Sequence, residues 1–384
     1  MTLSSRLLQA WQRRGPLAAL LWPVSQLYGA LLGLRRLAYQ TGLKRSERLA
    51  VPVLVVGNVV VGGAGKTPTV IAQLRHLREQ GWNPGVISRG YGREGEGCLE
   101  VSPDSSSREA GDEPLLIARA TGVPLAVGRQ RAEAGRLLLA RHPGLDILVC
   151  DDGMQHWALA RDLTVVVFDE RGCGNGWLLP AGLLREPWPA RAWGPEPAGE
   201  MLVLRTARPG IELSPLPAAQ AGGQVHLAQR ELAAEAVDAR GRRRPLSDFA
   251  LPNGGPVAAL AGIAQPQRFF EMLGARGLEL AQTLELPDHA DGALMLAALQ
   301  DCQARIGANA SQSEARSATP SSLCWLCTEK DAVKLFPLLA GQPGLEVWAV
   351  PLEQKPAPGF WHQLDGALNR LRERLSFPHG RQTA

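Results

Sequence analysis

The chain has 384 residues, of which 45% are hydrophobic and 20% charged, and its formal net charge is +4. This composition excludes a disordered chain and is sufficient for two domains with separate cores. The mild positive charge suits an anionic substrate or surface. Because no stretch combines dense Lys/Arg clusters with aromatic residues, we do not expect a nucleic acid as a partner.

The first predicted element is an apolar helix near the N-terminus. Residues 16–34 carry no charged side chain, and the pairs Arg13-Arg14 and Arg35-Arg36 flank them. Apolar side chains recur within it at helical spacing, at Leu17, Leu20, Leu21, Val24, Leu27, Tyr28 and Leu31. This spacing is typical of a helix with one apolar face.

Four interpretations of this helix compete. A signal peptide conflicts with the phosphate-binding loop described below, because an exported chain would meet no ATP. A transmembrane helix would have the minimum length, would be broken by Pro23, Ser25 and Gln26, and would have arginines at both ends, which give no orientation signal. The pattern favours a helix lying on the cytoplasmic leaflet of a membrane. A helix packed into the core of the first domain is the fourth interpretation.

A phosphate-binding loop follows in residues 51–68, VPVLVVGNVVVGGAGKTP, where an apolar strand runs into a glycine turn. Glycines allow backbone amides to converge on a phosphate, Lys66 would reach the β- and γ-phosphates, and Thr67 would offer its hydroxyl to Mg²⁺. The next helix would direct its positive N-terminal end at the anion. The predicted nucleotide-binding residues are Val60, Val61, Gly62, Gly63, Ala64, Gly65, Lys66 and Thr67.

This loop departs from the standard G-x-x-x-x-G-K-[ST] pattern, which requires glycine where the chain has Val60. The alternative is a glycine-rich turn with an exposed lysine. The preceding strand, the three glycines and the early Pro68 argue against that alternative.

Alternating strands and helices come next, with a helix at 69–80, a turn entering a strand at 83–88, and strands at 145–150 and 163–168. This alternation predicts a parallel sheet with right-handed crossovers. Asp151 and Asp152 close the third of these four segments, where carboxylates face the ligand crevice of such a sheet. We expect them to hold Mg²⁺ together with Thr67, the alternative being a helix cap or an exposed loop pair.

The composition changes in the middle of the chain. Proline and glycine are dense at 194–223, and the stretch 224–245 is polar. A second strand-helix-strand pattern follows at 256–261, 266–276 and 278–284. We therefore predict an α/β chain with an N-terminal membrane-associated helix, a P-loop NTPase-type parallel sheet domain, a linker and a second, smaller α/β domain. Their predicted bounds are 1–45, 46–210, 211–253 and 254–384.

Two features lie within the second predicted domain. The Ala/Ser-rich stretch 308–322 predicts an exposed, mobile insertion. Cys324 and Cys327 form a CxxC inside the apolar run LCWLC, and no second CxxC accompanies it. That pattern favours a buried strand with free thiols in a reducing compartment over a zinc site.

Two subclasses of P-loop proteins are disfavoured by single positions. Metal-chaperone and partition ATPases usually have a lysine just before the paired glycines, where this chain has Val61. Guanine-specific proteins carry [NT]-K-x-D, whereas Thr328-Glu329-Lys330-Asp331 has its lysine one place late.

Seven segments together resemble the tetraacyldisaccharide 4'-kinases, the lipid A kinases of Gram-negative bacteria, over nearly the whole chain. They are GNVVVGGAGKTP (57–68), SRGYGR (88–93), GDEP (111–114), DDGMQH (151–156), LPAGLLREP (179–187), PDH (287–289) and TEKDAVK (328–334). The phosphate loop of that family is similarly shifted from the standard pattern, which accounts for Val60. Ala290 and Leu183 depart from residues frequent in that family, which has a larger side chain and a proline there.

The resemblance implies phosphorylation by ATP of the 4'-hydroxyl of a tetraacyldisaccharide 1-phosphate, a lipid A precursor, at the cytoplasmic face of the inner membrane. By motif, Asp112 would accept the hydroxyl proton and His289 would act with it. Since these two residues lie in separate halves of the chain, the domains would have to close. The residues that match substrate-facing segments are Tyr91, Arg131, Arg185 and Glu186.

Two other functions remain as alternatives. A P-loop ATPase could act as a switch in assembling or loading another protein, although Val61 argues against it. A membrane scaffold could bind nucleotide only for stability. Without the resemblance, Asp112 would be read as a helix cap and His289 as an exposed loop residue.

Overall fold

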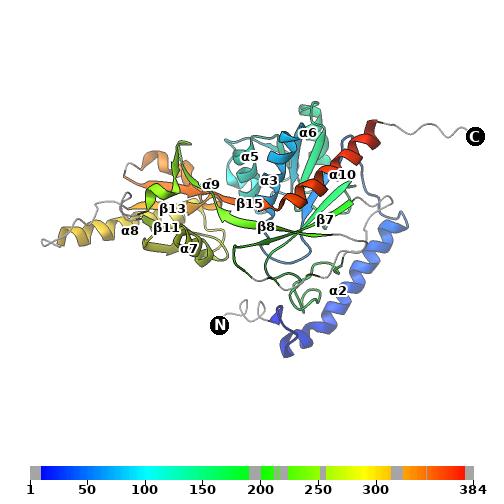
Figure 1. Cartoon of the computed structure of the whole chain (residues 1–384), viewed down its shortest axis with the longest axis horizontal. Coiled ribbons are helices and arrows are strands. Elements are labelled where there is room, and N and C mark those ends of the chain that lie inside the picture. Colours follow the sequence, from blue (N-terminus) through cyan, green and yellow to red (C-terminus); the bar gives the residue numbers. More distant parts are fainter. Residues whose placement is uncertain are drawn as a thin grey trace, which may run out of the picture.

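Two β-sheets organise the part of the chain that the computed structural model describes (Figure 1). That part comprises residues 10–189, 200–211, 213, 216, 224–250, 257–312, 323–342 and 344–376.

The larger sheet carries the phosphate loop. It has nine strands, of which only the two edge strands run antiparallel to their neighbours. In spatial order they are β15 (Leu352–Pro356), β8 (Val225–Leu232), β7 (Glu200–Ala207), β6 (Leu163–Phe168), β1 (Val53–Gly57), β5 (Ile147–Asp151), β2 (Pro84–Ser88), β4 (Leu125–Val127) and β3 (Leu99–Val101).

Helices cover both faces of this sheet because its central strands are apolar on both sides. Leu54 and Val56 of β1 face α3 (Lys66–Glu79), α5 (Asp112–Thr121) and α10 (Pro358–Ser376), whereas Val53 and Val55 face α6 (Arg131–Arg141). The short helix α4 (Ser107–Ala110) leads into α5.

The smaller sheet has six strands, with a parallel part and an antiparallel edge. In spatial order they are β10 (Arg243–Pro245), β9 (Glu235–Asp238), β14 (Glu346–Val350), β13 (Cys324–Thr328), β11 (Val257–Ala261) and β12 (Leu280–Glu285). One face packs on α7 (Pro266–Ala275), and the other packs on α8 (Gly292–Gln312) and α9 (Glu329–Leu335). The 3₁₀ turns η1 (Leu246–Phe249) and η2 (Phe336–Gly341) complete this unit.

The α/β class and most of the predicted elements are confirmed. The strands, however, do not divide between the two sheets at the predicted domain bounds. The predicted linker 211–253 contains β8 of the larger sheet together with β9 and β10 of the smaller one. The chain also returns to the larger sheet through β15 and α10, which the sequence placed in the second domain. Strand pairing depends on contacts distant in sequence, and composition carries no record of them.

The N-terminal helix α2 (Pro16–Gln40) is continuous through Pro23, as the helical spacing from Leu17 to Leu31 predicts, and without the break that the transmembrane interpretation placed at this residue. A proline removes one backbone hydrogen bond, and side-chain contacts to the body hold the helix beyond it. Ser25 Oγ donates to the carbonyl of Leu178 at 2.9 Å, and the Tyr28 hydroxyl donates to the carbonyl of Arg185 at 2.8 Å.

One face of α2 is apolar and exposed, which contradicts the interpretation as a core helix. Only 11% of its most apolar 18-residue window is buried, and it is the one described helix long and apolar enough to cross a membrane by length and composition. Large apolar side chains exposed along it are Leu17, Leu20, Trp22, Val24, Leu27, Leu31, Leu34 and Leu37.

The structure also bears on the predicted insertion at 308–322 and on the CxxC. Residues 308–312 of the predicted insertion continue α8, and the remainder of the insertion lies outside the described residues. Cys324 and Cys327 are free thiols on β13, as expected for a buried strand. Among the residues described, no group of His, Cys, Asp or Glu has the arrangement of a metal cage.

Candidate active site

The phosphate loop connects the end of β1 to the start of α3. Gly65 caps α3 in the left-handed region, with φ of 80°, and no side chain occupies the first amides of the helix. A 14-residue helix presented in this way offers its N–H groups and its positive end to an anion. Gly62 and Gly63 are exposed, whereas Val60 is fully buried and its backbone pairs with Leu184. Val60 therefore packs beneath the turn.

Lys66 points towards the carboxylate pair at the end of β5. Its Nζ lies 3.4 Å from Asn58 Oδ1 and 3.4 Å from Asp152 Oδ1. Thr67 is half-buried in the first turn of the same helix. Lys66 of the loop and Asp152 at the end of β5 thus face a common space.

Asp151 has the properties of a metal ligand. It is buried, its Oδ2 accepts a hydrogen bond from Ser88 Oγ at 3.1 Å, and its Oδ1 has no hydrogen-bond partner among the described residues. Burial raises the pKa of Asp151 to about 7, and the nearby charges of Glu113 and Asp152 add to this shift. An uncompensated carboxylate in this position fits a divalent cation, because a cation supplies the missing positive charge.

Asp112 and His289 meet across the two sheet units. Asp112 begins α5, and Gly111 before it has φ of 89°, where a Cβ would lie 2.9 Å from the carbonyl oxygen of Tyr91. His289 follows β12, and its Nδ1 lies 3.3 Å from Asp112 Oδ2. The residues that the sequence placed in separate halves are therefore in contact. Gly111 also packs against Gly90, two residues after the Ser88 that bonds Asp151, so the segment that leads into Asp112 passes next to the end of β5.

Backbone strain coincides with two of the predicted site residues. Among the described residues other than glycine, only Asp152 and His289 have positive φ, at 47° and 62°. Such conformations cost about 1–3 kcal/mol and persist where the surrounding structure imposes them, commonly at active sites. This strain is a signal independent of the sequence motifs.

The four predicted substrate-binding residues occupy different environments. Tyr91 is 72% exposed, and its ring centroid lies 6.3 Å from that of His289. Arg185 Nη1 lies 3.9 Å from Asp152 Oδ1. Arg131 is buried, with Nη2 donating to the carbonyl of Asp152 at 3.5 Å, which indicates a supporting position behind the carboxylates.

Glu186, the fourth predicted substrate-binding residue, is 1% exposed and is therefore buried below the protein surface. Burial raises its pKa to about 7, although Gln155 and Arg161 act in the opposite direction. Gln155 in turn donates to the carbonyl of Asn58 at 2.9 Å and accepts from Arg35 of α2 at 2.9 Å. The N-terminal helix is thus connected to the floor of the phosphate loop.

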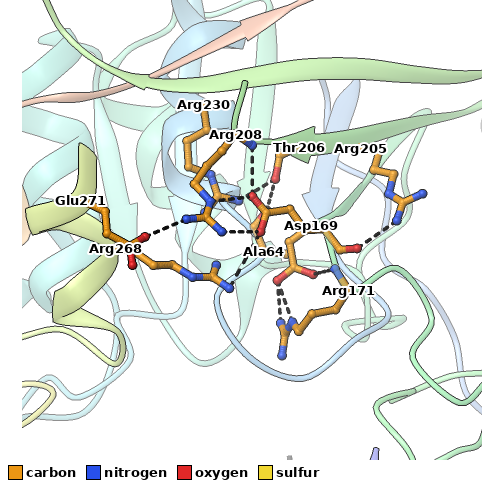
Figure 2. Close-up of polar contacts among 10 residues, drawn as sticks. Ala64, Asp169, Arg171, Arg205, Thr206, Arg208, Arg230, Arg268 and Glu271 are labelled. Atoms are coloured by element: carbon orange, nitrogen blue, oxygen red, sulfur yellow. Dashed lines mark hydrogen bonds and ion pairs between the residues drawn. The ribbon is translucent and has the colours of Figure 1, made fainter. Parts of the chain in front are cut away.

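Sequence reasoning missed a layer of arginines and acids beneath the loop (Figure 2). Arg171 donates to the carbonyl of Val61 at 3.0 Å and pairs with Asp169 at 2.8 Å. Thr206 donates to the carbonyl of Ala64 at 3.3 Å and accepts from Arg230 at 2.6 Å. These bonds hold two backbone carbonyls of the loop, those of Val61 and Ala64.

The same layer connects the two sheet units. Glu170, after β6, pairs with Arg208 at 3.0 Å and with Arg268 of α7 at 3.9 Å. Arg208 also pairs with Glu271 of α7 at 3.0 Å, as Figure 2 shows. No spacing rule in the sequence marks these residues, since they come from segments far apart in the chain.

Known proteins resemble this chain over nearly its whole length. The family described as "LpxK: Tetraacyldisaccharide-1-P 4'-kinase" matches residues 17–369. A protein of Acidovorax sp. (strain JS42) named "Tetraacyldisaccharide 4'-kinase" is 50% identical over 370 residues, covering 96% of each chain. One of the same name from Polaromonas naphthalenivorans (strain CJ2) is 48% identical over 377 residues, covering 98% of each chain.

A solved structure has the same fold. The crystal structure of LpxK from Aquifex aeolicus, described as an "apo" form in complex with ATP, superimposes with a TM-score of 0.69 at 25% sequence identity. The match covers 92% of this chain and 99% of that one.

Proposed function

Because this chain belongs to the tetraacyldisaccharide-1-P 4'-kinase family, we propose that the space between its two sheet units is where the phosphoryl group moves from ATP to the lipid. The chain is an ATP-dependent kinase of lipid A biosynthesis, and membership of this family sets aside the switch ATPase. The observation that carries the location of the site is the contact between Asp112 of the larger sheet unit and His289 of the smaller one at 3.3 Å.

The phosphate loop is proposed to hold the triphosphate. The free amides at the start of α3 bind phosphate oxygens, and Lys66 places its ammonium group on them. Thr67, Asp151 and Asp152 would hold Mg²⁺, which neutralises charge on the β- and γ-phosphates when bound. The unpartnered Oδ1 of Asp151 supports this assignment.

Asp112 is proposed to accept the proton of the attacking 4'-hydroxyl. Phosphoryl transfer depends chiefly on alignment and charge neutralisation, so a weak base positioned by a histidine is sufficient. Arg185, near Asp152, and the exposed Tyr91, beside His289, are proposed to contact the sugar phosphate, since a guanidinium group binds phosphate through paired hydrogen bonds. Arg131 and Glu186 are proposed to support them from behind.

The decisive test is the transfer of labelled γ-phosphate from ATP to tetraacyldisaccharide 1-phosphate dispersed in detergent. We expect labelled lipid from the purified protein, no labelled lipid in excess EDTA, and recovery when Mg²⁺ is added back. ATP consumption is measured in parallel. ATP hydrolysis without any labelled lipid would contradict transfer to this acceptor.

The exposed apolar face of α2 is proposed to lie in the cytoplasmic face of the inner membrane. Tyr28 on this helix bonds to the backbone of Arg185, so a lipid held at the membrane surface would be close to the site. Each exposed leucine that enters the membrane contributes roughly 1.5–3 kcal/mol.

We therefore expect the triple variant Leu20→Ser, Leu27→Ser, Leu31→Ser to shift from the vesicle-bound to the free fraction in flotation. These side chains make the exposed face, while Ser25 and Tyr28 keep their docking bonds. The single change Leu375→Ser, at an exposed leucine of α10, is the control and should leave binding unchanged. Unaltered flotation of the triple variant would mean that another surface is the anchor.

A further inference from the structure

The segment TEKDAVK at the start of α9 is a prominent motif that the proposed mechanism does not use. Thr328 caps this helix by accepting from the amide of Asp331 at 3.2 Å. Asp331 is fully buried and accepts from the amide of Gly262 at 3.1 Å, just after β11. The helix is therefore fixed to the small sheet, and its remaining polar residues have defined positions.

Lys334 extends from this helix to the proposed base. Its Nζ lies 2.9 Å from Asp112 Oδ2 and donates to the carbonyl of Ala290 at 2.9 Å. The side chain is only 7% exposed. An ammonium group so far from water requires an anionic partner, and Asp112 supplies it.

The contact involves both members of the proposed catalytic pair. Ala290 follows His289, whose φ is 62°, so the bond from Lys334 holds the backbone next to this strained residue. Lys330, one helical turn earlier, places its Nζ 3.3 Å from His289 Nε2 and 3.5 Å from Asp288. One face of α9 thus presents ammonium groups on either side of the pair.

We infer that Lys334 is a positioning residue, which holds the carboxylate of Asp112 in the orientation needed to take the hydroxyl proton. His289 and Lys334 both contact Oδ2, and this leaves Oδ1 to face the acceptor. Because Lys334 lies on the small sheet unit and Asp112 on the large one, the same contact makes the base competent only when the two units are together. This inference depends on the proposed role of Asp112.

The test is a double-mutant cycle on kcat in the full-length protein, with both substrates saturating. Lys334→Met should lower kcat roughly tenfold to a hundredfold, the scale of a misplaced reacting group, with KM for ATP unchanged. In the Asp112→Asn background the same change should cause no further loss, because Lys334 acts through that carboxylate. Lys355→Met, at an exposed lysine paired with Glu231, is the matched control and should retain full kcat.

Specific outcomes would overturn the inference. An unchanged kcat in Lys334→Met would do so, as would losses that multiply in the double variant, because Lys334 would then act by a route other than the carboxylate of Asp112. If the methionine variant does not fold, Lys334→Gln replaces it in the same cycle and is judged by the same criteria. If Asp112→Asn itself retains full kcat, the proposed base has failed, whereas loss at Asp112 without loss at Lys334 removes the positioning role alone.

Discussion

Asp112→Ala is expected to lower kcat by about two to four orders of magnitude, the usual contribution of a general base. The physical reason is that Asp112 is the carboxylate in contact with both His289 and Lys334, at 3.3 and 2.9 Å. Removing it also leaves the 7%-exposed Lys334 without its anionic partner, so unfolding must be measured alongside the kinetics. Single-turnover transfer to the lipid separates the chemical step from product release.

Asp112→Asn is the matched control, because asparagine keeps the shape of the side chain but lacks the basic carboxylate. Its kcat should be nearly as low as that of the alanine variant, while its melting temperature should remain closer to that of the parent protein. KM for ATP should change little, since the phosphate loop is separate. A kcat within twofold of the parent in Asp112→Asn would exclude this carboxylate as the base.

Lys66→Ala is expected to lower kcat/KM for ATP by about two to three orders of magnitude, the scale found when one preorganised charge-stabilising group is lost. Its ammonium is 13% exposed and lies 3.4 Å from Asp152 Oδ1, so it contributes positive charge where the γ-phosphate is proposed to lie. Lys66→Arg should not restore activity, because a planar guanidinium group does not replace a compact ammonium in this turn.

Lys44→Ala, at an exposed lysine beyond α2, is the control for Lys66 and should have the parent's kinetics. ATP affinity measured by titration distinguishes lost binding from lost catalysis. Retention of full lipid phosphorylation by Lys66→Ala would contradict the proposed role of this lysine in holding the triphosphate.

Local pattern was sufficient for much of the fold. Strand β6 was predicted at its observed bounds, and β5 and β11 were predicted within two residues, because uninterrupted apolar runs describe strands buried on both faces. Helix α3 begins three residues earlier than expected, at Lys66, because Pro68 is compatible with a first turn. Helix α2 continues through Pro23, as the helical spacing on both sides of this residue predicted, and docking contacts offset the lost bond.

The residues of the site differ in how far the sequence could predict them. The loop's glycines, Lys66 and the pair Asp151-Asp152 follow from the chemistry of phosphate and Mg²⁺, while Asp112 and His289 depended on the family resemblance, and their roles stay predictions. Arg171 and Thr206 beneath the loop carried no signal at all, because they act through single bonds to backbone carbonyls. Lys334 stood inside a quoted motif, yet its partner lies 222 residues away in sequence.

The class of the fold, the phosphate loop and the kinase family could be predicted from the sequence, since these depend on short segments with strong local preferences. Long-range contacts establish which sheet each strand joins, that β15 and α10 return to the larger unit, and that Lys334, His289 and Asp112 meet between the units. The reason is physical: pairing and burial are settled by contacts between distant segments, and a residue's charge partner is whatever the closed fold brings within a few ångströms.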